Sequence, residues 1–228
     1  MMNSKKSKLV VALLALGVIL SASQAQAFGL GNLVSAVGGG STSANAGDPD
    51  AFLKSAQTAE ALMGNSVNML VRSLVSKEKV AEIEAAKKAA SAVTDAAEKQ
   101  AKLTEVRTNS IALLNERMSN ENFKSDIEKM DGRQKEELGA SAFNFMLAML
   151  QDKALVEQSK GLITSISANP MNVGKLGMLK DTASSLSNQL SSAAQIAGKM
   201  PSIFSAVGVK APTSKDEKEK KVAQVSGE

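Results

Sequence analysis

Apolar side chains recur at intervals of three and four residues along most of this chain, the spacing that places them on one face of an α-helix. The first such stripe follows Asp48-Pro49-Asp50, a sequence typical of a helix start, because aspartate caps the first turn and proline suits its first position. The members of the stripe are Phe52, Ala56, Ala59, Met63, Val67, Leu70 and Leu74. The pattern therefore predicts an amphipathic helix that begins at Pro49.

The stretch from residue 77 to residue 118 has the most helical composition. Residues 81–101 contain nine alanines, and alanine is the best helix former. Acidic residues precede basic residues by four positions at Glu84–Lys88, Asp95–Lys99 and Glu98–Lys102. The apolar positions drift instead of keeping a heptad, so we expect one arm of a bundle rather than a long self-pairing coiled coil. Its small face, which we expect to pack on another helix of the same chain, consists of Ala86, Ala90, Val93 and Ala97.

Two further helices are predicted in the second half of the chain, over residues 133–168 and 179–197. Residues 143–150 are apolar on nearly all sides, so we place the centre of the core there. Asn169-Pro170 ends the first of these helices, and Gly198 with Pro201 ends the second. No stretch alternates apolar and polar residues as a strand does. We therefore expect an all-α fold, an elongated antiparallel bundle of four or five helices over residues 48–210.

The beginning of the chain has the three parts of a secretory signal peptide. Lys5, Lys6 and Lys8 precede an apolar run over residues 9–20, and the small-x-small motif Ala25-Gln26-Ala27 follows. This order predicts a signal peptide over residues 1–27, with cleavage after Ala25 as the alternative. A membrane anchor is disfavoured because the run is shorter than the roughly 20 apolar residues that span a bilayer.

Two regions of biased composition flank the expected bundle. Residues 28–37 are apolar and uncharged, and a Gly/Ser-rich linker follows up to residue 47. Residues 211–228 are charged and poor in apolar side chains, which predicts a disordered tail. The chain has no cysteine to carry a lipid, so we expect a periplasmic or secreted protein and not a lipoprotein. Much of the formal charge of +4 belongs to the signal lysines, which disfavours nucleic-acid binding.

Residue types that are missing from the sequence decide most of the chemistry. The chain has no histidine and no cysteine, so it cannot build a Ser-His or Cys-His triad or a zinc site of His and Cys. Glu136-Glu137, Asp152 and Glu157 remain as carboxylates, and we expect them on solvated faces. Ser159-Lys160 are adjacent on a helix and point apart. We therefore predict no catalytic residues, no cofactor, no metal and no enzymatic activity.

Two apolar segments outside the long helices, residues 28–37 and 202–209, are candidates for contact with a partner or a membrane. Packing of both segments against the bundle is the alternative. The candidate contact residues are Phe28, Leu30, Leu33, Val34, Val37, Ile203 and Phe204. In composition alone, the 77–118 stretch resembles periplasmic holdase chaperones, which implies a binding role but no particular residues.

The sequence therefore predicts an exported, non-enzymatic helical binding protein of the bacterial envelope, acting as scaffold, adaptor or chaperone. Its partner would be another envelope or secreted protein, and homo-oligomerisation stays open. The alternative is a membrane-active or lipid-associated helical protein, which the apolar residues 28–37 and 143–150 favour.

Overall fold

The computed structural model describes residues 48–168 and 174–221. The predicted signal peptide, the apolar segment and the linker lie outside these residues. Seven helices and no strands are found in the described part, which confirms the all-α prediction. The helices are α2 (Pro49–Leu74), α3 (Lys77–Ser91), α4 (Ala96–Met118), α5 (Phe123–Glu128), α6 (Gly132–Ser167), α7 (Leu176–Ala197) and α8 (Met200–Val207).

Aspartate caps define three of the helix starts. The Asp48 carboxylate accepts hydrogen bonds from the backbone N–H groups of Asp50 and Ala51, as the sequence predicts. Asp131 begins α6 with a capping box, in which its side chain and that of Gln134 each bond the other's backbone N–H.

The helix count differs from the predicted four or five because of one further cap and two short helices. The Asp95 carboxylate accepts from the Glu98 N–H at 2.8 Å and starts a new helix, α4. The predicted helix over residues 77–118 is therefore a hairpin of two helices, α3 and α4. Helices α5 and α8 are the short additional ones.

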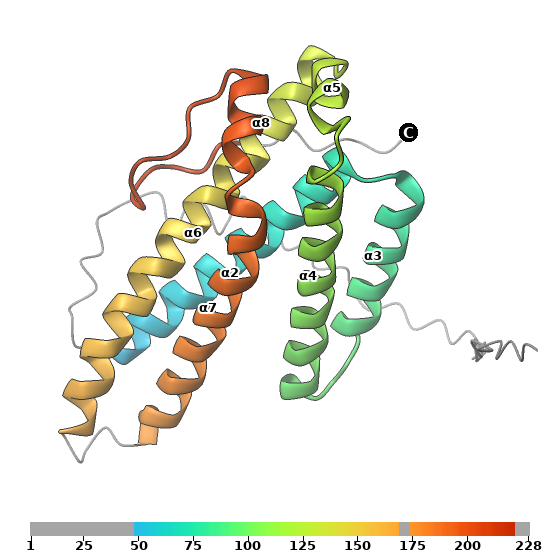
Figure 1. The fold of residues 1–228 in the computed structure, drawn as a ribbon. Helices are drawn as coiled ribbons and strands as arrows, with labels where there is room; N and C mark the ends of the chain where they lie inside the picture. Colours follow the sequence, from blue (N-terminus) through green and yellow to red (C-terminus); the bar gives the residue numbers. More distant parts are fainter. Residues whose placement is uncertain (1–47, 169–173, 222–228) are drawn as a thin grey trace, which may run out of the picture. The chain divides into compact units, whose positions relative to one another are not determined.

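Helices α2, α4, α6 and α7 form the centre of the fold. Figure 1 shows α6 and α7 side by side, with α2 crossing behind them and α3 beside α4 at the edge. Helices α5 and α8 pack together next to the first part of α6, at one end of the molecule. Among the described residues, no helix is long and apolar enough to cross a membrane.

The apolar core consists of two clusters. The larger one includes the fully buried Phe145 and extends to α5 and α8. The smaller one lies around the first part of α2 and the last part of α6, and contains Phe52, Ala56, Ala59, Leu155, Leu162, Ile166, Leu179 and Leu186. Phe143, Phe145, Leu147 and Ala148 belong to the larger cluster, as predicted, and Met146 and Met149 pack against it partly buried.

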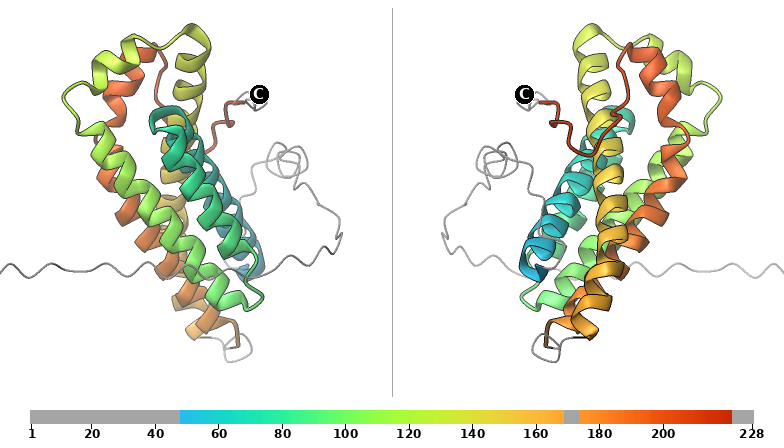
Figure 2. Two further views of the ribbon diagram at one scale, coloured as in Figure 1. Left: turned by 90° about the vertical axis from the view of Figure 1, so that its right-hand side faces the viewer. Right: turned by 90° about the vertical axis from the view of Figure 1, so that its left-hand side faces the viewer.

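Residues 211–221 belong to the predicted disordered tail, and the structure places them beside α6. This part of the chain has no helix but lies against α6, as the right-hand view of Figure 2 shows. We call residues 209–221 the C-terminal segment. Asn144 on α6 forms two hydrogen bonds of 2.8 Å with the backbone of Lys220, and Pro212 is buried. Composition alone missed these contacts because they use the backbone of the segment and few of its side chains.

Candidate functional site

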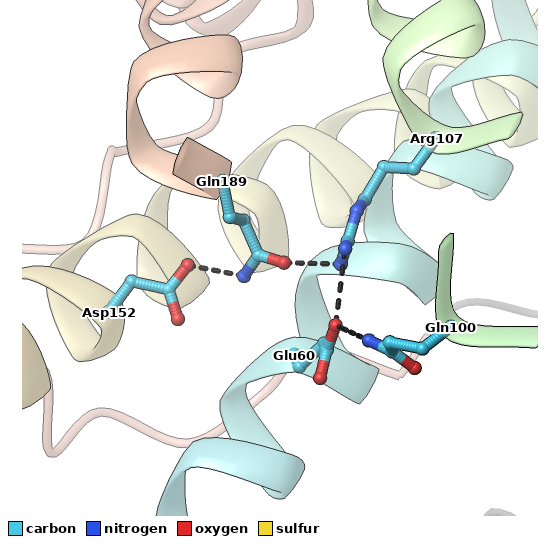
Figure 3. A network of polar contacts seen from close by, with 5 residues as sticks. All are labelled: Glu60, Gln100, Arg107, Asp152 and Gln189. Carbon is cyan, nitrogen blue, oxygen red and sulfur yellow. Dashed lines mark hydrogen bonds and ion pairs between the residues drawn. The ribbon is translucent and has the colours of Figure 1, made fainter. Parts of the chain in front are cut away.

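A set of polar residues lies between the two apolar clusters. On each of three helices, one polar residue separates the members of one cluster from those of the other. Glu60 follows Ala59 on α2, Asp152 precedes Leu155 on α6, and Gln189 follows Leu186 on α7. With Gln100 and Arg107 from α4, these residues form what we call the polar network (Figure 3).

The polar network is a chain of hydrogen bonds across four helices. Gln189 donates through Nε2 to Asp152 Oδ2 at 2.5 Å and accepts through Oε1 from Arg107. The second guanidinium nitrogen of Arg107 lies 3.1 Å from Glu60 Oε1, which also accepts from Gln100 Nε2 at 2.6 Å. The Gln189 amide thus lies between a cation and a carboxyl group, and its dipole is oriented favourably toward both (Figure 3).

Asp152 is the most unusual member of the network because its side chain is fully buried. Burial raises the pKa of its carboxyl group to about 6, although the Gln189 hydrogen bond and the charge of Arg107 favour the ionised form. Its second oxygen, Oδ1, has no hydrogen-bond partner among the described residues. The expectation that Asp152 lies on a solvated face is therefore wrong.

The helical spacing of α6 explains why Asp152 points inward. It follows Ala148 by four residues and precedes Leu155 by three, so it shares the face that carries both of these buried residues. Met149 and Val156, each one position after a buried residue of this face, are only partly buried. An aspartate in phase with the buried stripe was the signal that the sequence contained.

The other predicted carboxylates do not join the network. Glu136 and Glu157 are exposed, as expected, and Glu137 pairs with Arg133 at 3.1 Å. The Ser159 hydroxyl is buried and donates to a backbone carbonyl of its own helix, while Lys160 is exposed. In the described part of the chain, no group of three acidic residues converges in a way that could hold a metal ion.

A second feature is the α3–α4 hairpin, by which we mean residues 77–109. Ala90 is the only buried residue in this range. The hairpin is attached to α2 by the Arg72–Glu84 ion pair at 2.7 Å and the Gln100–Glu60 hydrogen bond, and its Val80 and Ile83 pack partly buried against the larger cluster. Of the predicted small face, Ala90 is buried, Val93 is partly buried, and Ala86 and Ala97 are exposed.

The outer face of α3 is lined with small side chains. Its exposed alanines recur at intervals of four and three residues, which places them on one side of the helix. They are Ala81, Ala85 and Ala89, followed by Ala92 at the helix end. Exposed Glu78 and Lys88 lie on the same side. A helix from another chain can approach such a face closely, and an acidic residue on it can pair with Lys88.

The predicted contact residues divide into two groups. Phe28, Leu30, Leu33, Val34 and Val37 lie outside the described residues. Ile203 is fully buried and Phe204 is 8% exposed, both on α8 within the larger cluster. These two residues therefore pack against the bundle, which was the alternative for this segment, and they offer no surface to a partner in this structure.

A shallow hollow of about 550 Å³ lies where α2 ends and α3 begins. Arg117 on its wall donates to the backbone oxygen of Leu74 at 3.0 Å and pairs with Asp126 at 2.8 Å. The arginine thereby ties the end of α2 to α4 and α5, which is a structural role.

The chain was also compared with known proteins. It matches no protein-family model, no curated protein and no solved structure at a significant level.

Proposed function

We propose that this chain is an exported, non-enzymatic binding protein of the bacterial envelope that holds a helical segment of another protein on its α3–α4 hairpin. The observation that carries this proposal is the near absence of buried residues between Lys77 and Asn109, where only Ala90 is buried. Export rests on the signal-peptide pattern of residues 1–27. An elongated antiparallel bundle formed by the remaining helices would serve as the scaffold for the hairpin.

The energetics of the hairpin support this proposal. Ordering a residue costs about 1–2 kcal/mol of backbone entropy, which burial of apolar surface normally offsets. The hairpin offsets only part of this cost, because Ala90 is its one buried residue and its apolar residues Val80 and Ile83 are only partly buried against the larger cluster. The low burial of this part of the chain therefore supports the proposal that it contacts another molecule.

The exposed face of α3 indicates the kind of partner. Alanines at Ala81, Ala85 and Ala89 leave a shallow surface on which side chains of a second helix can fit. Glu78 and Lys88 on the same side can each pair with an opposite charge on that helix. A scaffold or adaptor that binds one helical segment fits this surface better than a groove-forming receptor.

Arginine substitutions on α3 test the proposal. Ala85→Arg combined with Ala89→Arg should abolish recovery of the partner in a pull-down from the exported fraction, since two long charged side chains prevent close approach. The matched control is Ala194→Arg, at an exposed alanine on α7, which should leave recovery unchanged. Equal recovery with all three proteins, or loss with the α7 variant alone, would remove the hairpin as the binding surface.

The membrane-active alternative is not favoured by a specific observation. The apolar stretch over residues 143–150 motivated it, but Phe143, Phe145 and Leu147 are buried in the core. The outward side of this stretch carries the C-terminal segment. Its other motivation, residues 28–37, lies outside the described part of the chain.

A further inference from the structure

The C-terminal segment is held on α6 by bonds to its backbone. Asn144, only 6% exposed, donates through Nδ2 to the Lys220 carbonyl oxygen and accepts through Oδ1 from the Lys220 N–H, each at 2.8 Å. Gln151 Nε2 donates to the Lys215 carbonyl oxygen at 3.2 Å. Asn144 and Gln151 are seven residues apart, about two helical turns, and so lie on one face of α6. These contacts place no demand on which side chains the bound segment carries.

One side chain of the segment is recognised as well. The ammonium group of Lys220 lies 4.6 Å from the centre of the Phe143 ring, within the range of a cation–π contact. This contact selects a lysine or an arginine at the position whose backbone Asn144 holds. The surface therefore combines a paired backbone contact with one cationic side-chain site.

Gly139 on α6 allows the start of the C-terminal segment to pass close to this helix. A Cβ atom on Gly139 would lie 2.7 Å from a methyl carbon of Val209 and 3.0 Å from one of Val207. Gly139 is one helical turn before Phe143, so the chain crosses α6 closely before it reaches the aromatic ring. Beyond this crossing, Pro212 is the only buried residue between positions 211 and 221.

The segment itself has little that would fix it permanently. Most of its side chains are exposed, and the N–H groups of Thr213 and Ser214 bond the side chain of Glu217 within the segment rather than α6. A few hydrogen bonds, each worth about 0.5–1.5 kcal/mol net, oppose an ordering cost of similar size per residue. A segment held in this way exchanges readily with another that makes the same backbone contacts.

We infer that this face of α6, defined by Gly139, Phe143, Asn144 and Gln151, is a binding site for an extended, lysine-bearing polypeptide segment of another protein. The chain's own C-terminal segment occupies the site as an internal competitor. Asn144 holds the backbone of the bound segment and Phe143 holds its lysine. The site is separate from the α3–α4 hairpin and does not depend on the function proposed for it.

The test uses a fluorescent peptide with the sequence of residues 211–221, the full chain without residues 1–27, and the same chain ended after Lys210. The shortened chain retains both apolar clusters, whose last member is Phe204, and it should keep its thermal midpoint within a few degrees. It should bind the peptide saturably. The full chain should bind it at least about tenfold more weakly, since a tethered competitor acts at an effective concentration in the millimolar range.

Two changes test the backbone contact itself. In the shortened chain, Asn144→Leu should abolish peptide binding, whereas Asn188→Leu, at an exposed asparagine on α7, should leave it unchanged. A peptide methylated at the backbone nitrogen of the residue equivalent to Lys220 should fail to bind, because it lacks the N–H that Asn144 accepts. A peptide with alanine at that position should bind more weakly but measurably.

Several results would overturn the inference. They are the absence of peptide binding to a shortened chain that still melts normally, equal binding by the full and shortened chains, and binding that persists with Asn144→Leu. Sedimentation that shows full chains joined by exchanged C-terminal segments would also overturn it, since the occupant would then be a second copy. The Ala85→Arg and Ala89→Arg substitutions on α3 should leave peptide binding intact, which separates this site from the hairpin.

Discussion

At the scale of single residues, Asp152 is a buried carboxyl group that is connected to a charge of opposite sign. Its carboxyl group is fully buried, but the Gln189 amide connects it to the positive charge of Arg107. Arg107 is paired in turn with Glu60. Such a network stabilises one alignment of α2, α4, α6 and α7, because a shift of any of these helices leaves buried polar groups without partners.

The raised pKa of Asp152 predicts a pH dependence of stability. Its pKa is about 6 in the folded protein against 3.8 for the free side chain, so the folded state binds the proton more tightly. The free energy of unfolding should therefore fall as pH rises from 4 to 6, by at most about 3 kcal/mol from this group. Asp152→Asn should remove this fall, because its amide oxygen still accepts from Gln189 and does not titrate.

Urea unfolding of the wild type and of Asp152→Asn at pH 4, 5, 6 and 7 measures this contribution as the difference between the two curves. Glu157→Gln is the control, since Glu157 is an exposed carboxylate on the same helix, and it should follow the wild-type curve. Parallel curves for the wild type and Asp152→Asn would show that Asp152 is not buried as described.

At the scale of helices, the α3–α4 hairpin has one alanine that is packed against its neighbours and others that face solvent. Ala90 on α3 is 2% exposed and is the one point at which the hairpin excludes water fully. Ala86, four residues earlier, is exposed. The two alanines belong to the same predicted small face, and only the structure distinguishes them.

Leucine substitutions at these two alanines should therefore have different effects. Ala90→Leu should lower the free energy of unfolding by about 1–3 kcal/mol, because the added side chain overpacks the contact between α3 and its neighbours. Ala86→Leu should change it by less than about 0.5 kcal/mol. Thermal melts at two protein concentrations check this, and the Ala90→Leu effect should be the same at both. An effect that varies with concentration would mean that Ala90 packs against a second copy.

Helix positions were predictable wherever local chemistry decides them. Asp48-Pro49 caps α2, and the Phe52 stripe is buried as its spacing indicates. The Asp95 cap was present in the sequence but was assigned to an ion pair with Lys99 inside one long helix. A side chain that suits both a cap and a helix interior does not by itself decide between them.

At the scale of the whole molecule, the parts that sequence reasoning missed depend on contacts between distant segments. The polar network joins residues of four helices, and Asn144 meets Lys220 across 76 positions of the chain. Periodicity within a helix cannot show such partners. The all-round apolar character of residues 143–150 was visible in the sequence, but the C-terminal segment that covers its outward side was not.

The account at these three scales is that α3 and the first part of α4 are packed weakly on a core of α2, α6, α7 and the last part of α4, and we propose that they present small side chains to a partner. Most buried residues lie on α2 and α6, and α7 and the last part of α4 contribute the next largest sets. The hairpin adds length and exposed surface while contributing only Ala90 to the buried interior. The claim that this surface binds another protein is the centre of the account.

Site-specific photo-crosslinking of the protein in the cells that produce it tests that claim most directly. A photoreactive residue in place of Ala85 on α3 should give one discrete adduct with another protein, and competition by the unlabelled protein should reduce it. The same photoreactive residue in place of Ala194 on α7, which is also exposed, should give no adduct. Adducts of equal yield at both positions, or at position 194 alone, would contradict the account.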